Sequence, residues 1–78
     1  MVARAISEAF DRFGIDVRRK QAEIIGESSP SSWTRLVNGH ASPTVAKVES
    51  WLESAGGLGY AVEIRWNTWS GITVTVER

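Results

Sequence analysis

The sequence contains no cysteine, and its one histidine is His40. Disulfide bonds, thiolate metal sites and a cysteine nucleophile are therefore excluded, and one histidine cannot build a multi-histidine metal centre. The carboxylates form no convincing acid/base pair, no glycine-rich phosphate loop is present, and the serines have no plausible activating base. We therefore expect a protein that is not an enzyme and that uses no metal and no cofactor.

Long apolar runs are also missing. The first ten residues, MVARAISEAF, lack the uninterrupted apolar core of a signal peptide, and no run approaches the roughly 20 residues that span a bilayer. A chain of 78 residues can bury one modest core. We expect a single cytoplasmic domain over residues 1–78 that makes no membrane contact.

Net charge is absent as well, since nine Lys or Arg balance nine Asp or Glu. The charges are nevertheless distributed unevenly along the chain. Residues 12–47 carry a net +3, whereas residues 48–78 carry a net −2. This asymmetry is a weak indication of two surfaces with different partners.

The periodicity of the first part of the chain predicts two helices. Apolar residues spaced by three and four indicate a helix over residues 2–13, which Gly14 is placed to end. A shorter helix is expected over residues 17–25, with Asp16 as its N-cap and Gly26 as its terminator. The residues expected to be buried in these helices are Ile6, Ala9, Phe10, Phe13, Val17, Ile24 and Ile25.

The two prolines of the chain each follow a serine, in a pattern that is typical of helix starts. Proline is favoured at the first helical position, and a preceding serine can accept a bond from a free amide. Ser29-Pro30 and Ser42-Pro43 therefore predict helices over residues 30–38 and 43–55, and Asn38-Gly39 is expected to end the first of them. The second of these helices carries Val45, Val48, Leu52 and Ala55 on one face.

Beyond Gly56-Gly57 the apolar period changes from helical to two. Alternation over residues 60–66 and 72–77 predicts two half-buried strands, which residues 67–71 join into a β-hairpin. The fold class expected is mainly α with a C-terminal β-hairpin, divided into a helical part at residues 1–57 and a hairpin at residues 58–78.

The predicted helix at residues 30–38 has two chemically different faces. Trp33, Leu36 and Val37 fall together on a helical wheel, whereas hydrogen-bonding side chains lie on the opposite side. A helix with such a polar face suits the major groove of DNA, where Arg, Asn, Ser and Thr pair with base edges or phosphates. The residues on this polar face are Ser31, Thr34, Arg35 and Asn38.

Three stretches of the sequence resemble the lambda-repressor-like (Cro-type, XRE) helix-turn-helix family. They are SPSSWTRLVNGH, the Ser42-Pro43 pair, and AGGLGYAVEIRW, an ending found in small phage and prophage regulators. The resemblance implies a DNA-binding domain with residues 30–38 as recognition helix, acting as a dimer on a near-palindromic operator. It also implies a repressor that binds double-stranded DNA in the nucleoid of a bacterial host.

Candidate DNA contacts follow from the polar face and from the resemblance. Arg35 is the strongest candidate for a base or phosphate contact. Asn38 can equally serve as a helix C-terminal residue, His40 can be an ordinary surface residue, and the basic run at residues 18–20 can confer solubility instead of holding phosphates. The candidates are Arg18, Arg19, Lys20, Ser31, Ser32, Thr34, Arg35, Asn38 and His40.

Two hypotheses concern the hairpin. It can cover the helical core of its own chain, or an edge strand can pair with a second copy and build a homodimer. In a rival function, an antitoxin or phage-encoded inhibitor would use the hairpin and Trp69 to bind another protein. Trp33 and Trp51 are expected in the core. The dimerisation candidates are Tyr60, Val62, Ile64, Trp66, Trp69, Ile72 and Val74.

Overall fold

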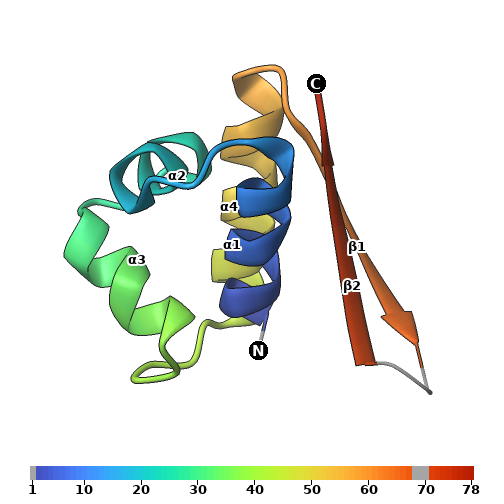
Figure 1. Cartoon of the computed structure of the whole chain (residues 1–78). Helices are drawn as coiled ribbons and strands as arrows, with labels where there is room; N and C mark the ends of the chain where they lie inside the picture. Colours follow the sequence, from blue (N-terminus) through green and yellow to red (C-terminus); the bar gives the residue numbers. More distant parts are fainter. Residues whose placement is uncertain (1, 68–70) are drawn as a thin grey trace.

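The computed structural model describes residues 2–67 and 71–78, which form helices followed by a two-stranded hairpin (Figure 1). This order confirms the mainly helical class with a C-terminal hairpin. The elements are α1 (Val2–Phe13), α2 (Arg18–Ile25), α3 (Pro30–Val37), α4 (Val45–Gly57), β1 (Ala61–Asn67) and β2 (Gly71–Glu77). In these described ranges, no helix is both long enough and apolar enough to cross a membrane.

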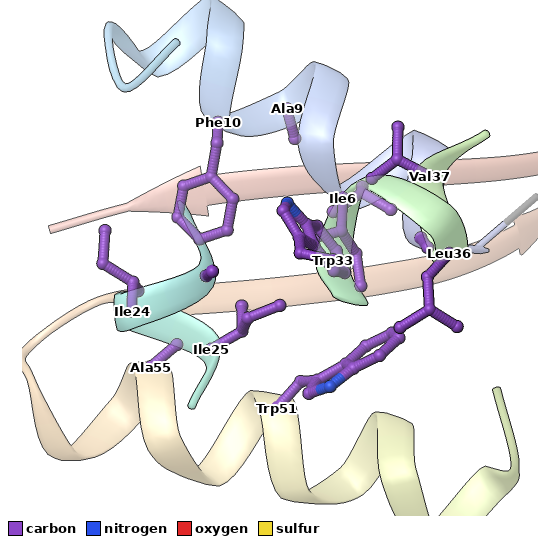
Figure 2. Close-up of a cluster of buried hydrophobic side chains, with 13 residues drawn as sticks. Ile6, Ala9, Phe10, Ile24, Ile25, Trp33, Leu36, Val37, Trp51 and Ala55 are labelled. Atoms are coloured by element: carbon purple, nitrogen blue, oxygen red, sulfur yellow. The ribbon is translucent and has the colours of Figure 1, made fainter. Parts of the chain in front are cut away.

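The helices enclose one apolar core, and α2 and α3 lie on the side of α1 and α4 that is opposite to the hairpin (Figure 1). Figure 2 shows the Trp33 indole in the middle of the core, between Phe10 of α1 and Trp51 of α4. Trp33 and Trp51 are buried and meet edge to face with ring centroids 5.2 Å apart. Both tryptophans are therefore core residues, as expected.

Helix boundaries agree with the sequence pattern at α1 and α3 and differ at α2 and α4. The prediction of Asp16 as N-cap was wrong, because α2 begins one residue later and Val17 takes the cap position without a side-chain bond. The start at Ser42-Pro43 was also wrong, because the Thr44 hydroxyl caps α4 by accepting from the Lys47 amide at 3.1 Å. The predicted end at residue 55 was wrong too, because α4 continues to Gly57.

Three residues expected in the core have substantial exposure. Val17 is exposed because it precedes α2 instead of lying inside it. Val45 is exposed because the buried face of α4 is centred on Trp51 and Ala55. Phe13 lies at the end of α1, where its ring meets Tyr60 edge to face at 6.1 Å between centroids.

The hairpin covers the helical core within its own chain. Its antiparallel register pairs Val62 with Val76 and Ile64 with Val74, which places these apolar side chains on one face of the sheet. This face packs against the helices, β2 on α1 and β1 on α4. The Arg12 guanidinium supports the packing by donating to the Val74 main-chain oxygen at 3.3 Å.

This packing determines where the dimerisation candidates lie. Val74 is buried, and the half-buried members of the set pack against the core of their own chain; these are Tyr60, Val62, Ile64 and Ile72. Trp66 is 76% exposed at the end of β1. Trp69 lies outside the described residues. Of the described candidates, Trp66 presents by far the largest apolar surface to solvent.

Candidate nucleic-acid interface

The turn between α2 and α3 holds these helices against α4. Gly26 ends α2 in the left-handed conformation, at φ 81°, where a side chain would be strained. A Cβ atom here would also lie 2.9 Å from the hydroxyl oxygen of Ser54 on α4. That hydroxyl donates to the Ile24 main-chain oxygen at 3.0 Å. The glycine thus allows both the turn and the close approach of α2 to α4.

The first turn of α3 is fixed by its own serines. The Ser29 hydroxyl accepts from the Ser32 amide at 3.2 Å, and Pro30 occupies the first helical position. The sequence prediction of a helix start at Ser29-Pro30 is confirmed. Loss of such a cap typically costs about 1 kcal/mol.

Glu27 connects the turn to α3 and α4. Its carboxylate, whose side chain is only 4% exposed, accepts from the Trp51 indole at 2.8 Å and from the Ser32 hydroxyl at 3.1 Å. The Lys47 ammonium lies 3.3 Å away. Burial by itself would raise the pKa of Glu27, but the bonds from Trp51, Lys47 and Ser32 together lower it below its ordinary value.

Gln21 connects α3 to α1 and α2 through the core. Its side chain is completely buried, and its amide oxygen accepts from the Trp33 indole at 3.0 Å and from the Ser7 hydroxyl at 2.7 Å. Its amide nitrogen donates to the Ile15 main-chain oxygen and to an Asp11 carboxylate oxygen, both at 2.8 Å. Every hydrogen-bonding group of this buried amide has a partner, as buried polar groups require.

The buried face of α3 therefore has both apolar and polar attachments. Trp33, Leu36 and Val37 are buried, as the helical wheel predicted. The pattern of residues 17–25 did not reveal the partner of the Trp33 indole nitrogen. A polar residue within an otherwise buried helix face is the signal that could have identified Gln21.

The opposite face of α3 is open to solvent. Ser31, Arg35 and Asn38 are exposed, and Thr34 is half-buried between them and the core. Within residues 2–67 and 71–78, the Arg35 guanidinium has no hydrogen-bond or salt-bridge partner. Asn38 occupies the C-cap position of α3, so its main chain ends the helix while its side chain is exposed. The structure thus brings together the polar side chains that the wheel grouped.

The remaining DNA-contact candidates divide into two groups. Arg19, Lys20 and His40 are exposed. Arg18 and Ser32 are engaged inside the protein, because the Arg18 guanidinium donates to the Ser7 hydroxyl at 2.6 Å and the Ser32 hydroxyl donates to Glu27. These two side chains help to hold α2 and α3 in place.

The side chains on this surface offer hydrogen bonds and charge. In the described part of the chain, no group of three His, Cys, Asp or Glu side chains is placed to bind a metal ion. A projecting helix with Ser, Thr, Arg and Asn side chains can pair with base edges and phosphate oxygens.

Comparison of the chain with protein-family models, with curated proteins and with solved structures found no match in any of the three.

Proposed function

We propose that this protein is a sequence-specific regulator that binds double-stranded DNA with α3 in the major groove. The observation that carries the proposal is the two-sided attachment of α3. Its inner face is held by Gln21 and the core, its start is held by Glu27, and its outer face leaves Ser31, Arg35 and Asn38 free. A recognition helix needs such a rigid mount, because base readout requires side chains at fixed positions.

In this proposal the protein is a repressor of the small phage or prophage type that acts in the cytoplasm of a bacterial host. It works as a homodimer, so that two copies of α3 contact the half-sites of a near-palindromic operator. Repression follows from blocking the polymerase at that operator.

The exposed cations near α3 limit the electrostatic part of the affinity. Arg19, Lys20 and Arg35 are exposed, whereas Arg18 is engaged with Ser7 and Gln21. If Arg35 reads a base, Arg19 and Lys20 leave two phosphate contacts per chain, or four per dimer, which would give a slope of log affinity against log salt of about −4. Together with the zero net charge, this modest number predicts weak non-specific binding, so base contacts must supply much of the affinity for the operator.

Fluorescence anisotropy tests the proposal directly. The purified protein is titrated into a labelled pool of duplexes, which includes the DNA flanking its own gene, at several salt concentrations. We expect tight binding to one duplex and much weaker binding to the others. Equally weak binding to every duplex at low salt would contradict a sequence-specific regulator.

Arg35→Ala tests the role of α3 in base readout. If Arg35 makes a bidentate pair with a base, its removal should weaken binding to the preferred duplex by about 1–3 kcal/mol and flatten the preference at that base. Arg65→Ala is the matched control, since Arg65 is an exposed arginine on the hairpin side of the molecule, paired with Glu63. If Arg35→Ala leaves affinity and preference unchanged, this face of α3 does not read DNA.

The rival function, an antitoxin or phage-encoded inhibitor that binds another protein through the hairpin, remains a hypothesis. Its key residue, Trp69, lies outside the described residues. A pull-down with wild type and Trp69→Ala separates the two functions, because a partner lost only in the variant would support protein binding.

A further inference from the structure

An apolar groove lies beside the end of α3, where the buried Leu36 forms part of its wall, and neither the proposed DNA contacts nor the core accounts for it. The groove has a volume of about 550 Å³ and is formed by the start of α1, the end of α3 with the following loop, the first turns of α4, and β1. Its walls include Leu36, Val48 and Ile64. Pockets of this size with mainly apolar walls are typical of small-molecule sites.

Two large apolar side chains at the groove are exposed instead of packed. Val45 and Trp66 each keep 76% of their surface in solvent, although both line the groove. Removing an indole ring from water gives a large hydrophobic stabilisation for a domain of this size. An occupant of the groove would bury both side chains without any rearrangement of the core.

The chemical class of the occupant follows from the polar groups of the groove. Among the described residues that line the groove, Glu49 is the only ionisable one, and it takes part in no salt bridge with another described residue. A carboxylate and an exposed indole face share a preference for ammonium groups, the first by charge and the second by cation–π attraction.

The first turns of α1 and α4 also line the groove, and the positive ends of these helix dipoles oppose a cation. That partial charge is spread over several main-chain amides, and the Thr44 hydroxyl already accepts from one of them. Glu49 carries a full charge on one side chain. The ammonium group is therefore expected beside Glu49 and Trp66, and an anionic probe provides the opposing test.

We propose that this groove binds a small molecule that combines a flat apolar body with a single ammonium group. The apolar body lies against Val45, Val48 and Ile64, and the ammonium group lies between the Trp66 ring and the Glu49 carboxylate. This site does not depend on DNA contacts by α3, but it requires that the proposed homodimer leaves Trp66 uncovered.

Three probes of similar size test the chemical class: benzylammonium, benzyl alcohol and benzoate. Each is titrated into the ¹⁵N-labelled full-length chain at constant ionic strength, and amide and indole N–H shifts are followed by NMR. The cation should bind about fivefold more tightly than the alcohol. Its shifts should centre on Gly39, Val45, Glu49 and the Trp66 indole, all of which line the groove.

Two variants test the assigned residues. Glu49→Gln should weaken binding of the cation about threefold and leave binding of the alcohol unchanged. Trp66→Ala should weaken binding of the cation about threefold or more. Glu53→Gln is the matched control, because Glu53 is an exposed glutamate of α4 that does not line the groove. Undisturbed shifts of the core amides would show that each variant keeps its fold.

Several outcomes would overturn the proposal. Benzoate or benzyl alcohol binding as tightly as the cation would remove the ammonium assignment. Chemical-shift changes that map away from the groove would show that the probes bind elsewhere on the protein. Shifts at Val45 and Trp66 on simple dilution of the unliganded protein would show that a second copy occupies the groove instead.

Discussion

Gln21 and Glu27 both anchor α3 and its surroundings through a tryptophan indole, but they do so with different chemistry. Gln21 is a neutral amide, completely buried, that accepts from Trp33 and joins α1, α2 and α3. Glu27 is a carboxylate, also largely buried, that accepts from Trp51 and attracts the half-exposed Lys47. The neutral anchor has no charge to desolvate, whereas the charged one must offset that cost through its partners.

The comparison shows how a small domain can fix one helix from two sides. The Gln21 network holds the buried face of α3, and the Glu27 network holds its first turn. The anchoring side chain itself is charged only in the second network, so the two anchors can be separated by mutation, by pH and by salt.

The largest effect is expected from Gln21→Met, which keeps the shape of the side chain but removes its amide. The Trp33 indole, the Ser7 hydroxyl and the Ile15 carbonyl would lose this partner in a buried setting. The free energy of unfolding should fall by about 3 kcal/mol, since each unsatisfied buried group costs about 1–3 kcal/mol. Urea denaturation followed by circular dichroism measures this free energy of unfolding.

Ser31→Ala is the control for that experiment, because Ser31 lies on the exposed face of α3. The free energy of unfolding of Ser31→Ala should stay within about 0.5 kcal/mol of the wild-type value. A loss below about 1 kcal/mol for Gln21→Met would mean that the buried amide network contributes little to the stability of the domain.

A smaller, pH-dependent effect is expected from Glu27→Gln. At pH 7 the free energy of unfolding of the variant should be lower by about 1–2 kcal/mol, because an amide replaces a charged acceptor of several hydrogen bonds. The pKa of Glu27 in the folded protein lies below its ordinary value of 4.5, so the unfolded chain binds the proton more readily. The stabilisation is present above pH 4.5 and is lost as pH falls through the lowered pKa.

The difference in the free energy of unfolding between wild type and Glu27→Gln, here the stability gap, should therefore narrow as pH falls from 7 toward 3. The gap between wild type and Gln21→Met should change less over the same range, because the Gln21 amide does not titrate and, in the described part of the chain, Asp11 is the one carboxylate that bonds to it. A Glu27→Gln gap that stays constant with pH would contradict the charged-anchor interpretation.

The smallest effect is expected from Lys47→Met. The Lys47 side chain is half exposed, at 50%, so solvent screens its attraction to Glu27. The loss should be about 0.5 kcal/mol at low salt and should vanish near 1 M salt. If the loss persists unchanged at 1 M salt, the lysine acts through packing of its apolar stem instead of its charge.

Much of the fold could be predicted from local pattern. Periods of three to four and of two gave the helices and the hairpin, and the Ser29-Pro30 pair gave the start of α3. The errors in the helix starts lie at cap positions, where Val17 precedes α2 and Thr44 caps α4. Several residues in these stretches can serve as a cap, and the packing of each helix determines which of them lies at the turn.

The sequence by itself determined which side chains of α3 are apolar and which are polar, because a helix of 3.6 residues per turn separates them whatever its surroundings. Only the tertiary structure decided how that helix is held. Gln21 meets Trp33 and Glu27 meets Trp51 across different helices. The groove beside Trp66 likewise combines walls from α1, α3, α4 and β1. Contacts between segments far apart in the chain depend on packing geometry, which local periodicity does not encode.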